Sequence, residues 1–243
     1  MDKTRLVRFI KKYSLGGIVE SVKWESTGTK LSVRFISDDR TVFGNVMLDE
    51  FNEFGDIELG VYTTSQLLSM LGILGSDIAM TLTRVGDTAI SLDMSDSDME
   101  TTARYMLSDL SILTPPPKPT NLPTDFDFGV TLTKKTMDTF MKGVGALSNT
   151  KGFSVVTKDA VTSLIIGYSN LASNSISIPV EVSIDGKAVT LPFSAPNFAH
   201  MLRANTECDS AIFNISKRGI GKLSFAHDGY TSDYYMSAIQ EEK

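Results

Sequence analysis

The chain is poor in the features that mark secreted, membrane-bound or disulfide-stabilised proteins. Its 243 residues include one cysteine, Cys208, so no disulfide can form within the chain, and a reducing compartment fits this usage. No run of about 18 apolar residues occurs, so we expect no helix that spans a membrane. The residues that follow Met1 lack the apolar core of a signal peptide. We therefore expect a cytoplasmic chain with no membrane partner.

The sequence also lacks the residue sets that carry most enzyme chemistry. It has two histidines, His200 and His227, and neither belongs to a HExxH or Cys/His pattern. Cys208 stands between Glu207 and Asp209, whose negative charges disfavour a reactive thiolate. No GxSxG or GxxxxGK[ST] motif is present. We expect a protein that is not an enzyme, with no catalytic residue, no cofactor and no metal.

Charge is spread unevenly along the chain. The net charge is −6, and residues 1–34 carry +5, residues 35–125 carry −11 and residues 126–243 carry 0. The acidic run from Asp93 to Glu100 lacks the glycine and the distal glutamate of a calcium loop, so it predicts an acidic hairpin turn. A basic first segment in an acidic chain indicates an interaction surface.

Proline is concentrated in one place. Five of the eight prolines lie in Leu113–Thr124, and proline fixes φ and removes an amide donor. This stretch predicts an extended connector rather than a helix or a central strand. We expect an N-terminal domain over residues 1–112, a connector over residues 113–124 and a C-terminal domain over residues 125–243.

An internal repeat surrounds the connector. Four segments carry large apolar residues at the spacing of one helix face, and they begin at residues 6, 67, 137 and 198, so successive starts lie 61, 70 and 61 residues apart. The segments are Leu6/Phe9/Ile10/Tyr13, Leu67/Met70/Leu71/Leu74, Met137/Phe140/Met141/Val144 and Phe198/Met201/Leu202. The two halves are thus offset by 131 residues at both helices. Each half predicts two helices.

Short stretches rich in β-branched and aromatic residues separate the helices. Each quarter of the chain reads as a strand, a helix and three strands, except that the first quarter has almost nothing before its helix. Each helix needs a sheet to cover its single apolar face. The predicted fold class is α+β, with two similar domains that each duplicate a β-α-β-β-β unit and place the helices on one face of antiparallel sheets.

Three of the four helices carry basic residues on the side opposite the apolar face. We expect these residues to contact a polyanion, and contacts to phosphates would supply affinity that is independent of sequence. The second helix shows only Ser65, Gln66 and Ser69 at these positions, and the candidates on the other three are Arg5, Arg8, Lys11, Lys12, Lys135, Lys142, His200 and Arg203.

Two expected strands fall at the edges of the predicted domains. They are Met99 to Leu107 and Ser175 to Ile184, and Pro179 supports an edge position for the second strand. An unpaired edge can pair with another chain. We therefore expect these strands to form an intermolecular seam.

The whole pattern resembles a DNA sliding clamp, most nearly the clamp of T-even and related phages, a viral relative of proliferating cell nuclear antigen (PCNA). The resemblance rests on the helix Leu6-x-x-Phe9-Ile10, the segment Tyr62 to Leu74 and the Pro115 to Pro123 connector. It implies a homotrimeric ring that encircles double-stranded DNA in replication as a polymerase processivity factor. It further implies a DNA polymerase and an ATP-dependent clamp loader as partners, and the host cell cytoplasm as location if the chain is viral.

Clamps of this family also bind the short hydrophobic tail of a partner protein. The stretches that match this pocket are Ile112, Leu113, Leu122, Met236, Ala238 and Ile239. One alternative is a non-enzymatic phage structural or assembly subunit built from duplicated α+β domains. The mass in solution separates this alternative from a ring. An enzyme is a second alternative, tested by whether a metal or nucleotide binds tightly, and an open-groove nucleic-acid binder is a third, which would hold linear and circular DNA equally.

Overall fold

The computed structural model describes residues 1–96, 100–113, 116, 122–168, 173–184, 186 and 190–240. Contacts within the chain divide it into two compact units. Unit 1 comprises Met1–Asp38, Gly44–Pro117 and Asp228–Ser232, and unit 2 comprises Asp39–Phe43, Lys118–His227 and Asp233–Lys243. Residues Asp39–Phe43 thus group with unit 2, although the residues on either side of them group with unit 1. Residues Asp228–Ser232 group with unit 1, although the residues on either side of them group with unit 2. The predicted domain ranges, which follow chain order, stay a prediction.

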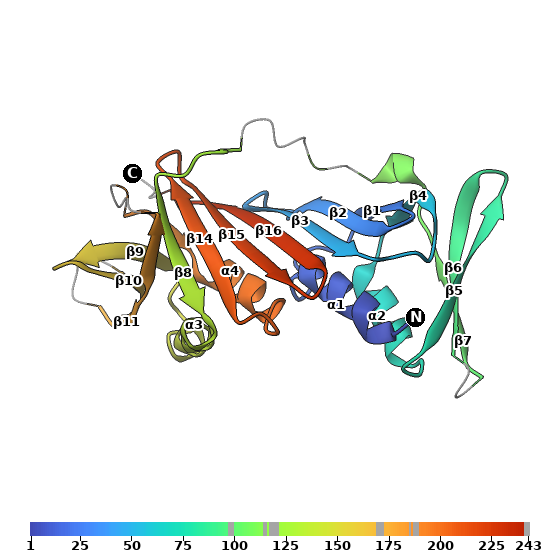
Figure 1. Cartoon of the computed structure of the whole chain (residues 1–243), viewed down its shortest axis with the longest axis horizontal. Coiled ribbons are helices and arrows are strands. Elements are labelled where there is room, and N and C mark those ends of the chain that lie inside the picture. Colours follow the sequence, from blue (N-terminus) through green and yellow to red (C-terminus); the bar gives the residue numbers. More distant parts are fainter. Residues whose placement is uncertain are drawn as a thin grey trace. The chain divides into compact units, whose positions relative to one another are not determined.

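Unit 1 contains two α-helices and two sets of antiparallel strands, one of them part of a larger sheet (Figure 1). In one sheet the strands are neighbours in the order β3, β2, β1, β4, and in the other the order is β5, β6, β7. The elements are α1 (Lys3–Ser14), β1 (Val22–Thr27), β2 (Lys30–Ile36), β3 (Val42–Asp49), β4 (Asp56–Val61), α2 (Thr64–Gly72), β5 (Ile78–Val85), β6 (Thr88–Asp96), β7 (Thr102–Met106) and a short 3₁₀ helix η1 (Leu110–Ile112).

Helix α1 forms where the apolar spacing predicts it. The Asp2 carboxylate caps its first turn by accepting the N–H of Thr4 at 2.7 Å. Its apolar side chains are buried, and the Phe9 ring lies 5.9 Å from the Trp24 ring of β1 in an edge-to-face arrangement. The helix ends at Ser14, and its C-cap Leu15, whose φ of 49° is left-handed, precedes two glycines that also have positive φ.

Unit 2 repeats this plan. Its strands are neighbours in the orders β12, β8, β14, β15, β16 and β11, β10, β9, β13. The elements are β8 (Phe128–Thr133), α3 (Lys134–Ala146), β9 (Gly152–Lys158), β10 (Val161–Ile166), β11 (Ile176–Pro179), β12 (Glu181–Ile184), β13 (Pro192–Ser194), α4 (Ala195–Arg203), β14 (Ser210–Ser216), β15 (Ile220–His227) and β16 (Tyr230–Ser237), whose first three residues group with unit 1.

The core of unit 2 is a cluster of phenylalanines between its helices and strands. Phe140 of α3 and Phe198 of α4 have ring centroids 5.0 Å apart, and Phe153 of β9 lies 4.6 Å from Phe198. Phe213 of β14 lies 5.0 Å from Phe198, and all four rings are buried. Aromatic pairs at these separations contribute both buried area and favourable ring geometry. The apolar faces of α3 and α4 therefore meet each other over the strands.

The predicted fold class is confirmed: each unit has two helices on antiparallel sheets, and the helices occupy the repeated apolar segments. Some strand predictions were wrong. Ser175 to Ile184 is two strands, β11 and β12, which belong to different sheets and meet at Val180. The acidic residue Asp93 lies in strand β6 rather than in a turn. Before α1, the only strand-like pairing among the described residues is the bridge between Asp2 and Asp77.

The connector falls largely outside the description. Of residues 113–124, the structure describes Leu113, Pro116 and residues 122–124, so the predicted extended conformation of the remainder lies outside the described residues. The same holds for Met99, at the start of one predicted edge strand. Within the described ranges, no helix is both long and apolar enough to cross a membrane.

Candidate nucleic-acid interface and partner surfaces

The basic side chains of helix α1 differ in whether they form hydrogen bonds or ion pairs. The Lys11 side chain is exposed and makes no hydrogen bond or ion pair among the described residues. The Arg5 guanidinium donates through Nη2 to the backbone carbonyl of Asp49 at 3.1 Å. The Arg8 guanidinium lies 3.4 Å from the carboxylate of Asp228, measured from Nη1 to Oδ2. These three cations reach solvent, but two of them already have partners within unit 1.

Lys12 is a correction to the sequence-based prediction. We expected it on the solvent side of α1, but its side chain is buried, with 1% of its surface exposed. Its Nζ lies 5.3 Å from the centre of the Tyr230 ring, which also lies 5.4 Å beneath the guanidinium of Arg8. The phenol of Tyr230 donates to the backbone carbonyl of Arg5 at 2.9 Å. The turn segment of residues 228–232 thus covers this flank of α1, and Lys12 cannot contact DNA in this conformation.

Among the described residues, the basic side chains of α3 and α4 form fewer hydrogen bonds and ion pairs than those of α1. The side chains of Lys135, Lys142 and Arg203 are exposed and make no hydrogen bond or ion pair within the part of the chain that the structure describes. The neighbouring Lys134 is held back, because its Nζ donates to the carbonyl of Thr206 at 2.7 Å. His200 is half-buried. As far as the described residues show, the helix pair of unit 2 therefore offers three cations without a partner.

Helix α2 differs from the other three helices. Its exposed residues include Ser65, Gln66 and Ser69, as the sequence predicts, and Ser69 donates its hydroxyl to the carbonyl of Ser65 at 2.9 Å. The exposed side of α2 is neutral, so a phosphate backbone would find no cation there.

The six predicted pocket residues divide between the two units. In unit 1, Leu113 is buried, and it lines a cavity of about 170 Å³ whose wall is partly apolar and partly charged, with Lys23, Arg34 and Glu58 among the lining residues. Ile112, next to it, is exposed over 61% of its surface. A cavity with apolar and charged lining beside an exposed apolar side chain can accept a partner residue that combines an apolar contact with a polar one.

The other four pocket residues lie in unit 2. Met236 is buried, Leu122 and Ala238 are half-buried, and Ile239 is exposed over 40% of its surface. Ala238 forms a β-bridge with Phe193, and Ile239 donates its N–H to the carbonyl of Pro192 at 2.7 Å. This end of the chain is therefore fastened to β13, while the Ile239 side chain remains accessible.

Both predicted edge strands lie at sheet edges. Among the described residues, β7 pairs on one side only, with β6, and β11 pairs on one side only, with β10. Leu107 donates its N–H to Ile90 of β6, so in this antiparallel ladder the backbone groups of Thr102, Arg104 and Met106 point away from β6.

The same alternation applies to β11. Val180 donates its N–H to Thr162 of β10, so the backbone groups of Ser177 and Pro179 point to the open edge. Pro179 offers a carbonyl but no N–H at that edge. Each unit thus exposes an unpaired row of backbone donors and acceptors.

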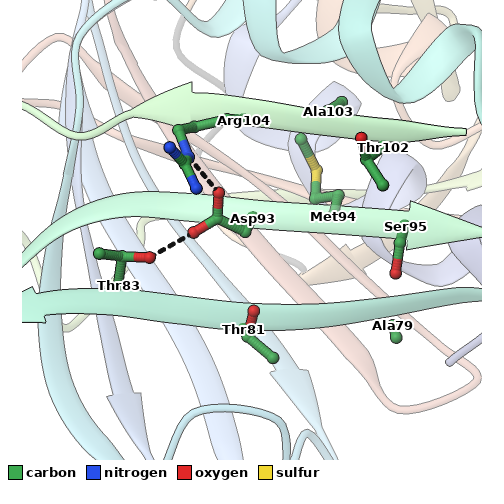
Figure 2. Close-up of a pocket in the computed structure, with 9 residues that line it drawn as sticks. All are labelled: Ala79, Thr81, Thr83, Asp93, Met94, Ser95, Thr102, Ala103 and Arg104. Carbon is green, nitrogen blue, oxygen red and sulfur yellow. Dashed lines mark hydrogen bonds and ion pairs between the residues drawn. The ribbon is translucent and has the colours of Figure 1, made fainter.

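Figure 2 shows the open face of the β5–β7 sheet. Asp93 of β6 points toward Arg104 of β7 on one side and toward Thr83 of β5 on the other. Its carboxylate accepts the Nε–H of Arg104 at 2.5 Å and the hydroxyl of Thr83 at 2.6 Å, and these hydrogen bonds lower the pKa of the Asp93 carboxyl. Apart from Met94, the remaining lining residues are small, and they include Ala79, Thr81 and Ser95. Arg104, the one charged side chain of β7, is thus neutralised within its own unit.

Candidate metal ligands and the single cysteine can be located in the part of the chain that the structure describes. No group of three or more His, Cys, Asp or Glu side chains there could hold a metal ion. Cys208 is buried.

Sequence reasoning missed Asp228 and Tyr230, which hold the cations of α1. They lie more than 200 positions from α1 in the chain. The available signal was the Asp228-Gly229 pair between two strand-like stretches, which predicts a tight turn. Nothing in the sequence pattern indicated that this turn packs against the first helix.

Comparison with known proteins bears on the fold. No protein-family model matches the sequence, and no curated protein matches it. Solved structures do match. A PCNA from Entamoeba histolytica shares 14% identity at a TM-score of 0.75, with 98% of this chain and 96% of that chain covered. A PCNA2–PCNA3 complex from Sulfolobus tokodaii gives 14% identity and a TM-score of 0.75, with 98% and 97% covered. The fold of this chain is therefore that of PCNA-type clamps over nearly its whole length.

Proposed function

We propose that this chain is the subunit of a sliding clamp, which encircles duplex DNA and tethers a DNA polymerase during replication. The observation that carries the proposal is the match to PCNA folds over 98% of the chain. The exposed cations on the helices support it, since the chain as a whole is acidic, at −6. The proposal assigns the chain no catalytic step.

In this proposal the basic side chains of the helices contact the phosphates of DNA and make no contact with the base edges. Lys11, Lys135, Lys142 and Arg203 are the candidates without a partner among the described residues, and Arg5 and Arg8 reach solvent beside partners of their own. Phosphate contacts carry no sequence information, so a ring that uses them can slide along the duplex. His200 is half-buried and is a weaker candidate, and Lys12 is no longer one.

We propose that copies of the chain join head to tail through the edges of β7 and β11. Antiparallel strands pair when the unpaired backbone groups of each edge face the other, and both edges expose such groups. This contact joins two different surfaces, and three copies close it into a ring if the rotation between copies is suitable. Because Arg104 is paired with Asp93 and β11 carries no charged residue, the seam depends on backbone hydrogen bonds and apolar packing rather than on ion pairs.

The partner surfaces are proposed from the exposed apolar residues near the connector and the last strand. A short hydrophobic peptide from a polymerase or from an ATP-dependent clamp loader would insert beside Ile112 and Leu113, or against Leu122, Met236, Ala238 and Ile239. The likeness to clamps of T-even phages belongs to this proposal as well, and it rests on the helix Leu6-x-x-Phe9-Ile10, the segment Tyr62 to Leu74 and the proline-rich connector.

The first test is the mass of the purified chain in solution, measured by light scattering. A mass three times that of the 26.5 kDa chain supports the ring. A monomer at all accessible concentrations contradicts it. Replacing Ser177 by Pro removes an N–H from the β11 edge, so this variant should dissociate at concentrations where the natural chain is assembled. Ser173→Pro, which lies outside β11, serves as the control.

The second test distinguishes a ring from an open-groove binder. A closed ring that has been loaded onto circular DNA stays on the circle and leaves when the DNA is cut once. A groove binder holds circular and linear DNA equally. A chain that assembles but does not stay on circular DNA in the presence of a loader would favour an assembly subunit instead.

A further inference from the structure

The turn between β15 and β16 places a carboxylate against the basic face of α1. Asp228 and Gly229 have φ values of 50° and 76°, which are the left-handed values that a tight two-residue hairpin turn requires. The carbonyl of Gly229 accepts the N–H of Asp49 at 2.8 Å, so the turn is held in place within unit 1. Asp228 is therefore presented at a defined position, with 71% of its side chain exposed.

Arg8 is held between this turn and the ring that follows it. Its guanidinium lies 3.4 Å from the Asp228 carboxylate and 5.4 Å from the centre of the Tyr230 ring. The Arg8 side chain is 31% exposed, so one side of the guanidinium faces solvent. The Tyr230 ring fixes the position of the Arg8 guanidinium. The Asp228 carboxylate occupies one of the directions from which an anion can approach this guanidinium.

The other acid near Arg8 is already engaged. The Asp2 carboxylate accepts the N–H of Thr4 at 2.7 Å, and this hydrogen bond, with smaller contributions from Arg8 and Arg5, lowers the pKa of the Asp2 carboxyl. Asp228 is the acid in direct contact with the guanidinium. Asparagine also adopts left-handed φ readily, so the turn by itself does not require a negative charge at residue 228.

We propose that Asp228 competes with DNA phosphates for Arg8 and thereby weakens the contact between α1 and the DNA backbone. This inference rests on the proposed function as a clamp. An ion pair between exposed side chains is weak, so a phosphate can displace the carboxylate. The displaced carboxylate still repels the phosphate at short range. Asp228 thus lowers the affinity for the duplex and keeps the ring free to slide.

The test uses the assembled chain and a fluorescent duplex short enough to enter a ring from its end. Binding is measured by anisotropy at salt concentrations from about 50 to 200 mM, the range over which phosphate contacts change affinity strongly. The forms compared are the natural chain, Asp228→Asn, Arg8→Gln and the double variant. Asp228→Asn should bind the duplex about three- to tenfold more tightly, and its salt dependence should steepen by roughly one phosphate contact.

The double variant and a matched control separate local competition from a change in net charge. In the Arg8→Gln background, Asp228→Asn should give no gain, because the carboxylate acts through Arg8. Asp159→Asn makes the same change in charge at another exposed turn residue with a φ of 50°, in unit 2, and it should leave affinity unchanged. Melting temperatures should agree among the forms, which shows that the turn still folds.

Each remaining outcome counts against the inference. If Asp228→Asn binds no more tightly than Asp159→Asn, or gains equally with and without Arg8, Asp228 does not compete for Arg8. In both cases the natural chain binds DNA, so the proposed function stands. If no form binds the duplex even at low salt, the proposed DNA contact is wrong and this inference is wrong with it.

Discussion

Helices α1 and α3 carry similar patterns of basic residues opposite an apolar face, yet their cations stand in different surroundings. On α1, Arg8 is paired with Asp228 and Lys12 is buried over Tyr230. On α3, Lys135 and Lys142 are exposed and unpaired among the described residues. This difference between α1 and α3 shows a limit of helical periodicity. The spacing of basic residues predicts which side of a helix is basic, but it does not establish which of these charges can reach a ligand. A segment distant in sequence can take some of them.

Removing the aromatic ring of Tyr230, which lies against α1, should have the largest effect of the substitutions proposed for these helices. Tyr230 is buried and lies against both Arg8 and Lys12, so Tyr230→Ala should lower the free energy of unfolding by about 3 to 5 kcal/mol. Tyr230→Phe removes only the hydrogen bond to the Arg5 carbonyl and should cost about 1 kcal/mol. Urea denaturation measures both values. If Tyr230→Ala and Tyr230→Phe lost equal amounts of unfolding free energy, the aromatic ring of Tyr230 would not stabilise α1.

The free cations of α3 should affect DNA binding rather than stability. Replacing Lys135 and Lys142 together by Ala should reduce the salt dependence of duplex binding by roughly two contacts. The free energy of unfolding should change by no more than about 0.5 kcal/mol per substitution, because these side chains are exposed. Anisotropy titrations at several salt concentrations and urea denaturation give the two results. An unchanged salt dependence would remove α3 from the proposed interface.

Two adjacent lysines of α1 should behave in opposite ways. Lys12→Ala deletes a buried side chain and should cost about 1 to 3 kcal/mol of stability without changing the salt dependence of binding. Lys11→Ala deletes an exposed one and should leave stability unchanged while reducing the salt dependence by roughly one contact. The same two measurements apply. A loss of DNA contact in Lys12→Ala alone would show that Lys12 leaves the Tyr230 ring when DNA binds.

The smallest expected difference concerns the first turns of the two helices. Asp2 caps α1 with a carboxylate, whereas Thr133 caps α3 with a hydroxyl. The hydrogen bond from Thr4 lowers the pKa of the Asp2 carboxyl below its ordinary value of 3.8, so its contribution is present above that pH and is lost as pH falls through the lower folded value. The Asp2→Asn variant keeps a side-chain acceptor. Melting curves between about pH 2 and 6 should show a larger acid loss for the natural chain than for Asp2→Asn.

Much of the fold was predictable because it depends on local periodicity. Apolar residues three and four positions apart mark the four helices, and all four lie in the repeated segments. Strand boundaries were predicted less well where pairing rather than composition decides them. Ser175 to Ile184 reads as one strand, but β11 pairs with β10 while β12 pairs with β8. Strand partners are distant in sequence, so no local pattern reports that division.

The sequence by itself determined the duplication, the α+β class and the presence of basic helix faces, because side-chain spacing controls which face of a helix is apolar. Tertiary structure alone decided which cations remain free. Asp228 and Tyr230 reach α1 only when the β15–β16 turn packs against it, and Asp93 neutralises Arg104 only when β6 and β7 pair. The effective charge of a side chain depends on its neighbours in space, and those neighbours are distant in sequence.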